Sequence, residues 1–270
     1  MEVVIMPNWV MNRLVLKGKD AKTVADKILS KDTDHNNKEY MDFNNIDKMP
    51  ESLNCVCGSC TVPALDYYLA TINPDMPEYE GEKLTPAKYK KYLKAINSTP
   101  SERQVKGVNE YGITPTDFDT IGNKESYLKY GKTIADNRAN YGYSTWYEWS
   151  RAHWGVKWNA SESRVERRTN EVTIYFETPW DGVSKLICKL AEQYKDLKLT
   201  IDYDFSEEQV AYYEKYMHFE KGELVDGCYY DEGSKEAYEH FMELWGLENE
   251  FRWDKEEGRY VPSWEDDDND

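Results

Sequence analysis

Basic side chains, histidine, cysteine and long apolar runs are all scarce in this sequence of 270 residues. Its 34 Lys and Arg are outnumbered by 51 Asp and Glu, which gives a net charge of −17. This balance argues against nucleic acid and anionic membranes as direct ligands, because phosphate binding depends on Lys and Arg. No apolar run reaches about 18 residues, and the first residues lack the basic start of a signal peptide. We therefore expect a cytoplasmic protein.

The five cysteines are an odd number, and in the cytoplasm they should be reduced. Three of them, Cys55, Cys57 and Cys60, have a spacing that could place three thiolates on one zinc ion. A fourth ligand would have to come from elsewhere, with His35, Cys188 and Cys228 as candidates. A structural zinc site normally uses two such clusters, and residues 49–82 contain no Lys or Arg to activate a thiol. We expect no disulfide and no cofactor, with zinc as the alternative.

Motifs of known enzyme classes are missing as well. The sequence contains neither a nucleophile elbow, nor a P-loop, nor a dinucleotide-binding glycine motif. His153 has no identifiable partner in the sequence. A carboxylate pair of Glu148 with Asp202 or Asp204 could be imagined, but no pattern brings these residues together. We expect the protein not to be an enzyme.

Hydrophobic periodicity predicts strands at residues 10–16, 172–176 and 197–205, because apolar and polar residues alternate there. Amphipathic helices are predicted at 21–29, 183–194 and 234–245, the last of them ending at Gly246. The order strand, helix, strand thus occurs twice. Because both of the first two helices have an apolar stripe and the strands alternate, the pattern predicts a two-layer α+β fold with one open sheet face.

Composition divides the chain further. Residues 6–50 and 141–246 are expected to form one discontinuous core domain. Residues 51–140, which are rich in proline and in short helical patterns, are expected to form a helical insertion. Residues 247–270 form an acidic C-terminal extension, and its last six residues predict a disordered tail.

Four short motifs, in this order along the chain, carry a resemblance. They are Met-Pro-Asn-Trp at 6–9, Asn-Arg-Leu at 12–14, Trp-Gly-Val-Lys-Trp-Asn-Ala at 154–160 and Phe-Glu-Thr-Pro-Trp at 176–180. Together they resemble the YubB-type ferredoxin-like domain family of phage and plasmid proteins. The resemblance implies a split βαβ sheet with helices on one face. It carries over neither an activity nor catalytic residues.

Five tryptophans lie between residues 146 and 180, within or before the last two of these motifs. One interpretation is a base-stacking platform of Trp146, Trp149, Trp154, Trp158 and Trp180 assisted by Arg151 and Lys157, as in sheets that bind single-stranded nucleic acid. The competing interpretation is an aromatic seam between helix and sheet. Since no basic stripe accompanies the rings, we expect Trp9, Trp154, Trp158 and Trp180 to be mostly buried.

Residues 201–270 hold 23 acidic and 6 basic residues, so the whole net charge lies there. This surplus could simply provide solubility, or it could mimic nucleic acid and occupy a basic groove of another protein. We expect the second: a non-enzymatic mobile-element protein that inhibits a basic nucleic-acid-handling host protein, such as a defence nuclease or a CRISPR effector. A nucleic-acid-binding module is the alternative, and an unrecognised enzyme comes third. The residues expected to bind the partner are Asp202, Asp204, Glu207, Glu208, Glu214, Tyr212, Tyr213 and Tyr216, with both aspartates on the solvent side of their strand.

Overall fold

The chain divides into two units, one of which is discontinuous. The computed structural model describes residues 8–33, 37–58, 60–72, 78–79, 82–83 and 124–263. The first unit combines Met1–Lys48 with Ser150–Asp270, and the second is Met49–Trp149. The second unit covers the segment for which the sequence predicts a helical insertion.

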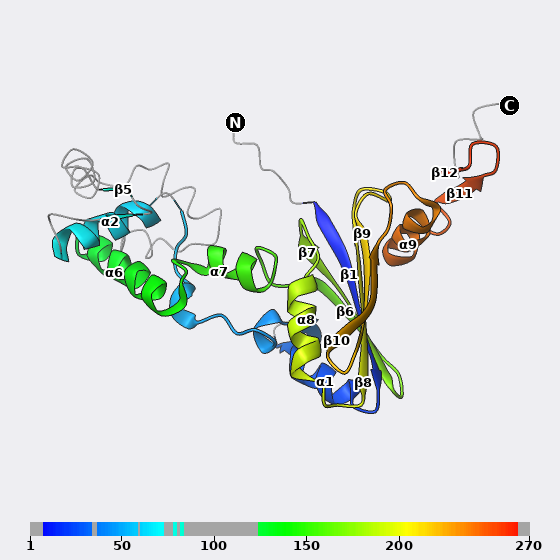
Figure 1. Cartoon of the computed structure of the whole chain (residues 1–270), viewed down its shortest axis with the longest axis horizontal. Helices are drawn as coiled ribbons and strands as arrows, with labels where there is room; N and C mark the ends of the chain where they lie inside the picture. Colours follow the sequence, from blue (N-terminus) through cyan, green and yellow to red (C-terminus); the bar gives the residue numbers. More distant parts are fainter. Residues whose placement is uncertain are drawn as a thin grey trace. The chain divides into compact units, whose positions relative to one another are not determined.

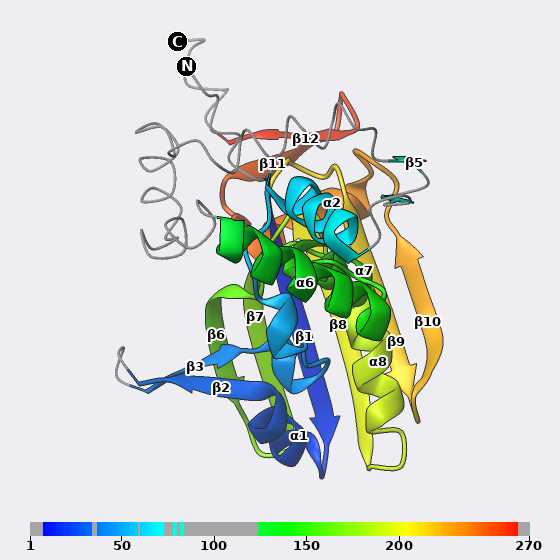
Figure 2. The same cartoon turned by 90° about the vertical axis from the view of Figure 1, so that its left-hand side faces the viewer.

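A six-stranded antiparallel sheet forms the centre of the first unit, with the strand order β10-β9-β8-β1-β7-β6 (Figure 2). The strands predicted at 10–16 and 172–176 lie within two neighbouring strands of this sheet, and the one predicted at 197–205 overlaps a third, which begins two residues later. The strands are β1 (Trp9–Gly18), β6 (Ser161–Arg167), β7 (Glu171–Pro179), β8 (Leu199–Glu207), β9 (Glu214–Glu220) and β10 (Glu223–Tyr229).

Two helices connect these strands in the order of a ferredoxin-like fold. The order along the chain is β1, α1 (Ala21–Ile28), β6, β7, α8 (Ser184–Gln193) and β8, which is the split βαβ arrangement. Both helices cover the same face of the sheet (Figure 1). The predicted α+β fold is therefore confirmed, as is the prediction that these two helices share one face.

Alternation along β1 explains why this face is covered. Every second residue from Val10 to Leu16 is fully buried, whereas the residues that alternate with them are only partly buried. The residues of β7 and β8 that face Leu14 and Leu16 are also apolar or aromatic and buried, and so are Ile28 of α1 and Leu186 of α8. Burying a large aliphatic side chain stabilises the fold by about 1.5–3 kcal/mol, so this layer is the main source of stability.

One polar residue, Asn12, lies inside this apolar layer and is fully satisfied. Its amide nitrogen donates hydrogen bonds to the Val10 carbonyl at 2.9 Å and to Thr178 Oγ1 at 2.8 Å. Its amide oxygen accepts a hydrogen bond from the Tyr203 hydroxyl at 2.6 Å. That hydroxyl in turn accepts one from the backbone N–H of Val183, just before α8. The network thus joins β1, β7, β8 and the start of α8.

A third helix, α9 (Lys235–Trp245), lies on the opposite face of the sheet (Figure 1). Ser234 caps its first turn by accepting a hydrogen bond from the Ala237 N–H, and Gly246 ends it with a left-handed φ of 68°. The predicted bounds of this helix are confirmed. The expectation of helices on one face only is wrong, because Phe241 and Met242 of α9 are buried against the other side.

Smaller elements complete the first unit. The strands β2 (Leu29–Asp32) and β3 (Lys38–Met41) form a hairpin, and η1 (Phe43–Asn45) is a short 3-10 helix. Within the predicted acidic extension, β11 (Phe251–Asp254) pairs with β12 (Arg259–Pro262). The predicted disordered tail lies outside the described residues.

The described part of the second unit is mainly helical. Its core consists of Ala64 and Leu65 from one helix and Tyr130 and Ile134 from another. Its elements are η2 (Glu51–Leu53), α2 (Thr61–Ile72), β4 (Glu78–Tyr79), β5 (Glu82–Lys83) and α6 (Lys124–Tyr141), and α7 (Trp146–His153) runs across the boundary into the first unit. Of the helices described in either unit, none combines the length and the apolar content needed to span a membrane.

The buried network gives a first testable expectation. Tyr203→Phe leaves the Asn12 oxygen and the Val183 N–H without their hydrogen bonds, and each buried orphan costs about 1–3 kcal/mol. We expect the free energy of unfolding, measured by urea denaturation, to fall by about 2 kcal/mol or more. Tyr212→Phe is the matched control because its side chain is 48% exposed, and it should change stability by less than about 0.5 kcal/mol. Equal effects of the two substitutions would contradict the proposed role of the network.

Candidate functional site

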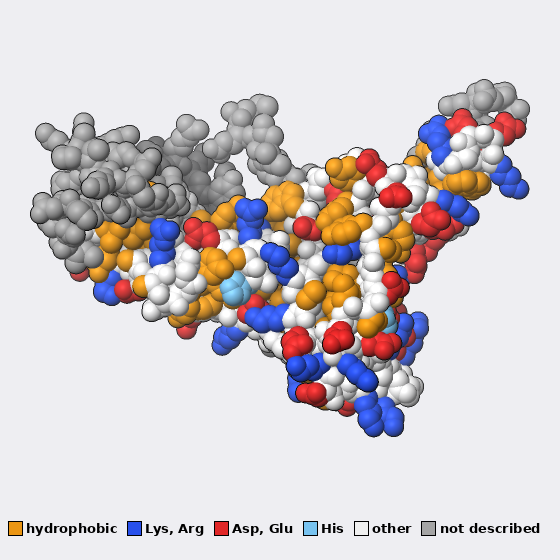
Figure 3. Space-filling view, in the orientation of Figure 1, with side chains coloured by type: hydrophobic (Ala, Val, Ile, Leu, Met, Phe, Trp, Pro, Cys, Tyr) orange, Lys and Arg blue, Asp and Glu red, His pale blue; other side chains and the backbone are white. Residues whose placement is uncertain are grey.

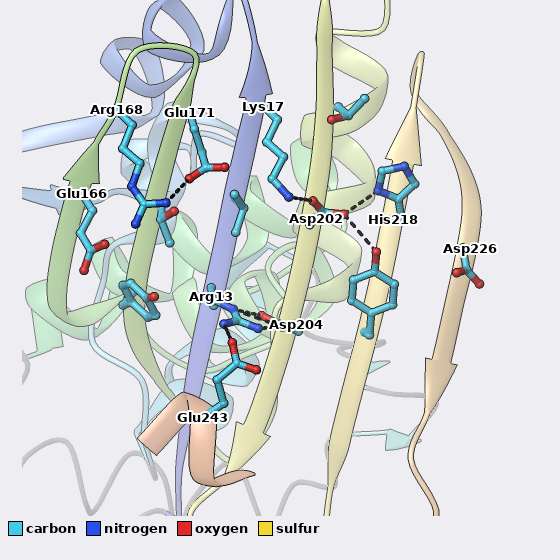
Figure 4. A pocket seen from close by; sticks show the side chains of 15 residues that line it. Arg13, Lys17, Glu166, Arg168, Glu171, Asp202, Asp204, His218, Asp226 and Glu243 are labelled. Atoms are coloured by element: carbon cyan, nitrogen blue, oxygen red, sulfur yellow. Dashed lines mark hydrogen bonds and ion pairs between the residues drawn. The ribbon is translucent and has the colours of Figure 1, made fainter. Parts of the chain in front are cut away.

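The face of the sheet opposite α1 and α8 contains a hollow of about 690 Å³ (Figure 4). Strands β6 to β10, β1 and the helix α9 contribute side chains to it. Six carboxylates line the hollow against three Lys or Arg and one His, so its lining is acidic. The charged lining residues are Arg13, Lys17, Glu166, Arg168, Glu171, Asp202, Asp204, His218, Asp226 and Glu243.

Two cations of β1 lie along the middle of the hollow, each facing a carboxylate of β8. Because β1 and β8 are antiparallel, Arg13 is opposite Asp204 and Val15 is opposite Asp202 in the ladder. Arg13 Nη2 lies 2.5 Å from Asp204 Oδ2, and Lys17 Nζ lies 2.9 Å from Asp202 Oδ2. Opposite charges on adjacent strands hold one another in place, so the charge pattern of the hollow is fixed by the strand register.

Asp202 is the centre of the more open end of the hollow. Besides Lys17, it accepts hydrogen bonds from the Tyr216 hydroxyl at 3.0 Å and from His218 Nδ1 at 2.5 Å. Partial burial raises the pKa of Asp202, but the hydrogen bonds from Lys17 and His218 outweigh it, so the pKa lies below its ordinary value. The hydrogen bond with Asp202 in turn raises the pKa of His218. An ionised carboxylate with three fixed donors suits electrostatic recognition better than proton transfer.

The other end of the hollow is closed by α9 over a buried charge cluster. Arg13 contacts both Asp204 and Glu243, and His240 lies between Glu214, at 2.5 Å, and Asp204, at 3.3 Å. Burial lowers the pKa of His240, but its contacts with Asp204 and Glu214 raise it to about 9, so the imidazolium form is held here. Burial raises the pKa of Glu214 in spite of His240. This cluster ties α9 to the sheet.

The structure separates the residues that the sequence predicted to bind a partner. Asp202 and Tyr216 line the hollow, Glu208 and Tyr212 are exposed, and Tyr213 is half-buried in a stack with Tyr229.

Three of the predicted carboxylates, Asp204, Glu207 and Glu214, are 6% exposed or less, so the prediction of an exposed surface is wrong for them. Asp204 was expected on the solvent side of β8, and it does point to the open face. That face is covered by α9 at this end, and the covering helix supplies His240 as a counterion.

Several lining residues were missed by the sequence analysis, notably Arg13, Lys17 and His218. Alternation along β1 does place Arg13 and Lys17 on its polar face. Pairing them with Asp204 and Asp202 needs the register between β1 and β8, which lie almost 190 residues apart in the chain, and no local pattern specifies it.

The cysteine cluster lies in the second unit. All five cysteines of the chain are free thiols. Cys55 and Cys60 pack against the helical core, and burial raises the pKa of both, to about 11 for Cys55. A raised pKa opposes the thiolate that zinc ligation requires. Within the described ranges, no three His, Cys, Asp or Glu side chains are placed to hold a metal ion. His35 lies outside the described residues.

The four tryptophans that the sequence predicts to be mostly buried all belong to the first unit. Trp154 is buried, as predicted, and its indole N–H donates to the Asp47 carbonyl at 2.9 Å. Trp9 is half-buried. Trp158 and Trp180 are 40% and 44% exposed, so most of the surface of each is buried, as predicted, but neither belongs to the core. Their rings contact each other with centroids 5.7 Å apart, and Lys157 Nζ lies over both.

The buried histidine gives a prediction about pH. Because the folded state raises the pKa of His240 from 6.5 to about 9, its stabilisation is complete below pH 6.5 and is lost as the pH rises through 9. His240→Gln leaves Glu214 without its counterion and removes one of the two cations beside Asp204, and we expect a loss of about 3 kcal/mol at pH 7. This difference from wild type should shrink above pH 9 in urea denaturation. His218→Gln, at a more open site, should cost less. A difference that stays constant from pH 7 to 10 would contradict the assignment.

One of the comparisons with known proteins, the match to a family model, supports this fold. Residues 153–248 match the model of a family described as the ferredoxin-like domain in Api92-like protein. A crystal structure of protein api92 from Yersinia pseudotuberculosis is similar over 85% of this chain and 100% of its own, with 12% sequence identity and a TM-score of 0.40. No curated protein matches the sequence. This chain therefore contains a ferredoxin-like domain similar to that of Api92-like proteins.

Proposed function

We propose that this protein is not an enzyme and acts by binding a basic protein on the open face of its sheet. The observation that carries the proposal is the acidic hollow between β6 and β10 with its fixed pattern of charges. A positively charged side chain that enters it meets carboxylates already oriented by strand pairing, so little reorganisation is needed on binding.

The surroundings of the hollow extend its charge. Glu236, Glu239 and Glu243 are exposed on α9, and acidic side chains gather over this helix in Figure 3. Exposed carboxylates also flank it on β10, at Glu223 and Asp226. Such a field steers a basic partner toward the surface and raises the association rate at low salt. Tyr216 inside the hollow and the exposed Tyr212 between β8 and β9 supply aromatic side chains of the kind enriched in interfaces.

A partner that fits this surface is a basic, nucleic-acid-handling host protein, such as a defence nuclease or a CRISPR effector, in the cytoplasm. Its phosphate-binding groove would receive the carboxylates in place of nucleic acid, and binding would inhibit it. The resemblance of the sequence to YubB-type proteins of phages and plasmids supports this choice, because mobile elements benefit from blocking host nucleases. Within the C-terminal quarter, Asp202, Glu208, Tyr212 and Tyr216 remain the predicted contacts, whereas Asp204, Glu207 and Glu214 are structural.

Charge reversal tests the proposal. The double variant Glu166→Lys/Asp226→Lys changes two lining carboxylates of the hollow, on β6 and β10. We expect the amount of a basic protein captured from host cells, quantified by mass spectrometry, to fall about tenfold or more. Captured partner should also be released by added DNA and as salt rises from about 50 to 200 mM, because exposed charges are screened.

The matched control reverses the same number of charges elsewhere. Glu192→Lys/Asp196→Lys changes two exposed carboxylates in and directly after α8, on the other side of the sheet. This control should capture the partner like wild type. The proposal is wrong if both double variants capture it equally, or if the captured protein is neither basic nor displaced by DNA.

A second candidate function, binding of single-stranded nucleic acid, is favoured by one observation. Trp158 and Trp180 present two adjoining, partly exposed rings with the Lys157 ammonium over both. Stacking of a base on an indole with a nearby cation for phosphate is a common mode of such binding. It ranks second because the net charge of −17 repels phosphate and, in the part of the chain that the structure describes, Lys157 is the only cation over the ring pair.

Trp180→Gly tests this candidate without straining the fold, because Trp180 has a φ of 65°, which glycine adopts freely. If bases stack on the pair, quenching of tryptophan fluorescence by a short oligothymidylate should need an about tenfold higher concentration in this variant. Trp253→Ala is the control, since Trp253 is 36% exposed and has Lys235 near its ring, but no other tryptophan of the described residues stacks on it. Unchanged quenching in Trp180→Gly would exclude the pair as a binding site.

A further inference from the structure

The strand β10 forms one edge of the six-stranded sheet, and β6 forms the other (Figure 2). All seven of its residues are exposed, and the side chains of Leu224, Val225 and Tyr229 are apolar or aromatic and more than half exposed. An edge strand presents a row of backbone N–H and C=O groups without a strand partner. An exposed edge of this kind is the structural requirement for strand addition by another chain.

The opposite edge of the sheet is different. The strand β6 contacts β3, and Ser163 Oγ accepts a hydrogen bond from the backbone N–H of Met41 on β3 at 3.1 Å. The ladder between β6 and β7 is also irregular between Ser161 and Arg164. Both edge ladders contain a register shift, so irregularity does not distinguish them. Covering by β3 protects β6 from further pairing, so β10 is the better edge for an added strand.

The two faces of β10 have opposite character. Asp226 pairs with His218 and Cys228 with Tyr216, and these partners line the acidic hollow. Glu223 pairs with Glu220, which itself faces the lining residue Thr200 across the ladder. A register shift at Val225 puts Leu224 on the other face, opposite the buried Phe219. Tyr229 lies on that face as well. The open face of β10 is therefore acidic, and its other face is apolar and aromatic.

The backbone geometry shows which groups are available. The Tyr230 N–H donates to the Glu214 carbonyl at 3.2 Å, so residue 230 points toward β9. Because backbone direction alternates in an antiparallel ladder, Asp226 and Cys228 also point toward β9, and Gly227 and Tyr229 point outward. Gly227 carries no side chain, which lets another backbone approach closely.

We propose that β10 accepts an additional strand from the basic partner, an extended segment in which Lys or Arg alternates with apolar residues. This inference rests on the proposed function and specifies how the partner is recognised. The basic residues of the segment face Asp226 and Glu223 on the open side, and its apolar residues pack beside Leu224 and Tyr229. Backbone hydrogen bonds to Gly227 and Tyr229 supply affinity, and the alternation of side chains supplies specificity.

Synthetic peptides test the proposal. A fluorescent peptide that alternates lysine and valine should bind about tenfold more tightly than a peptide of the same composition with the lysines and valines in two blocks. Two further peptides carry N-methyl groups on all the lysines or on all the valines. Because successive N–H groups of a strand point in opposite directions, one methylated peptide should bind normally and the other about tenfold more weakly.

Hydrogen exchange followed by NMR gives a second readout on the protein itself. On binding of the alternating peptide, the outward amides of Gly227 and Tyr229 should exchange more slowly, whereas those of Asp226 and Cys228 should change less. The proposal is wrong if the alternating peptide does not bind, if both methylated peptides bind alike, or if the outward amides are unaffected.

Failure of this proposal can be told apart from failure of the proposed function. If Glu166→Lys/Asp226→Lys abolishes capture of the basic protein but no strand addition is detected, the hollow alone recognises the partner. If that double variant captures the basic protein as well as wild type does, and neither the alternating nor the block peptide binds, both proposals are wrong. Both proposals are supported if the alternating peptide binds wild type and the control Glu192→Lys with equal affinity and binds Asp226→Lys more weakly.

Discussion

The buried amide of Asn12 constrains the rest of the first unit. It is hydrogen-bonded to β7 through Thr178 and to β8 through Tyr203, so it fixes the central strand against both neighbours. A slip of one residue would place this amide on the polar face and leave its partners without hydrogen bonds, at a cost of about 1–3 kcal/mol for each buried group. The same register decides what happens on the other side of β1. There it sets Arg13 opposite Asp204 and brings Lys17 to Asp202.

The ion pairs Arg13–Asp204 and Lys17–Asp202 both follow from this register, but they differ in how far they are covered. At one end, α9 covers Arg13 and Asp204, and His240 and Glu214 complete a buried cluster that holds the helix to the sheet. At the other end nothing in the described part of the chain covers Lys17 and Asp202, and the sheet forms a hollow. One helix thus divides an otherwise uniform polar face into a structural half and an accessible half.

The accessible half and the edge strand form one continuous surface, because Asp226 belongs both to the hollow and to β10. An added strand would extend the sheet and carry its basic side chains over the carboxylates of the hollow. Charge alone gives attraction and a fast association rate, whereas backbone pairing and alternation give a defined register. The exposed ring pair of Trp158 and Trp180 is a separate feature with its own test.

The sequence by itself determined the α+β fold, the central strands β1, β7 and β8, and the helices α1, α8 and α9, because their periodicity is local, as are the Ser234 cap and the Gly246 end of α9. It also determined that the net charge lies after residue 200. Only the tertiary structure decided which acidic side chains are accessible. Local alternation placed Asp202 and Asp204 on the same face of β8, and it could not foresee that α9, 30 residues later, buries one of them. The hairpin β9–β10 and the exposure of Trp158 and Trp180 likewise depend on contacts between distant segments, which no local pattern encodes.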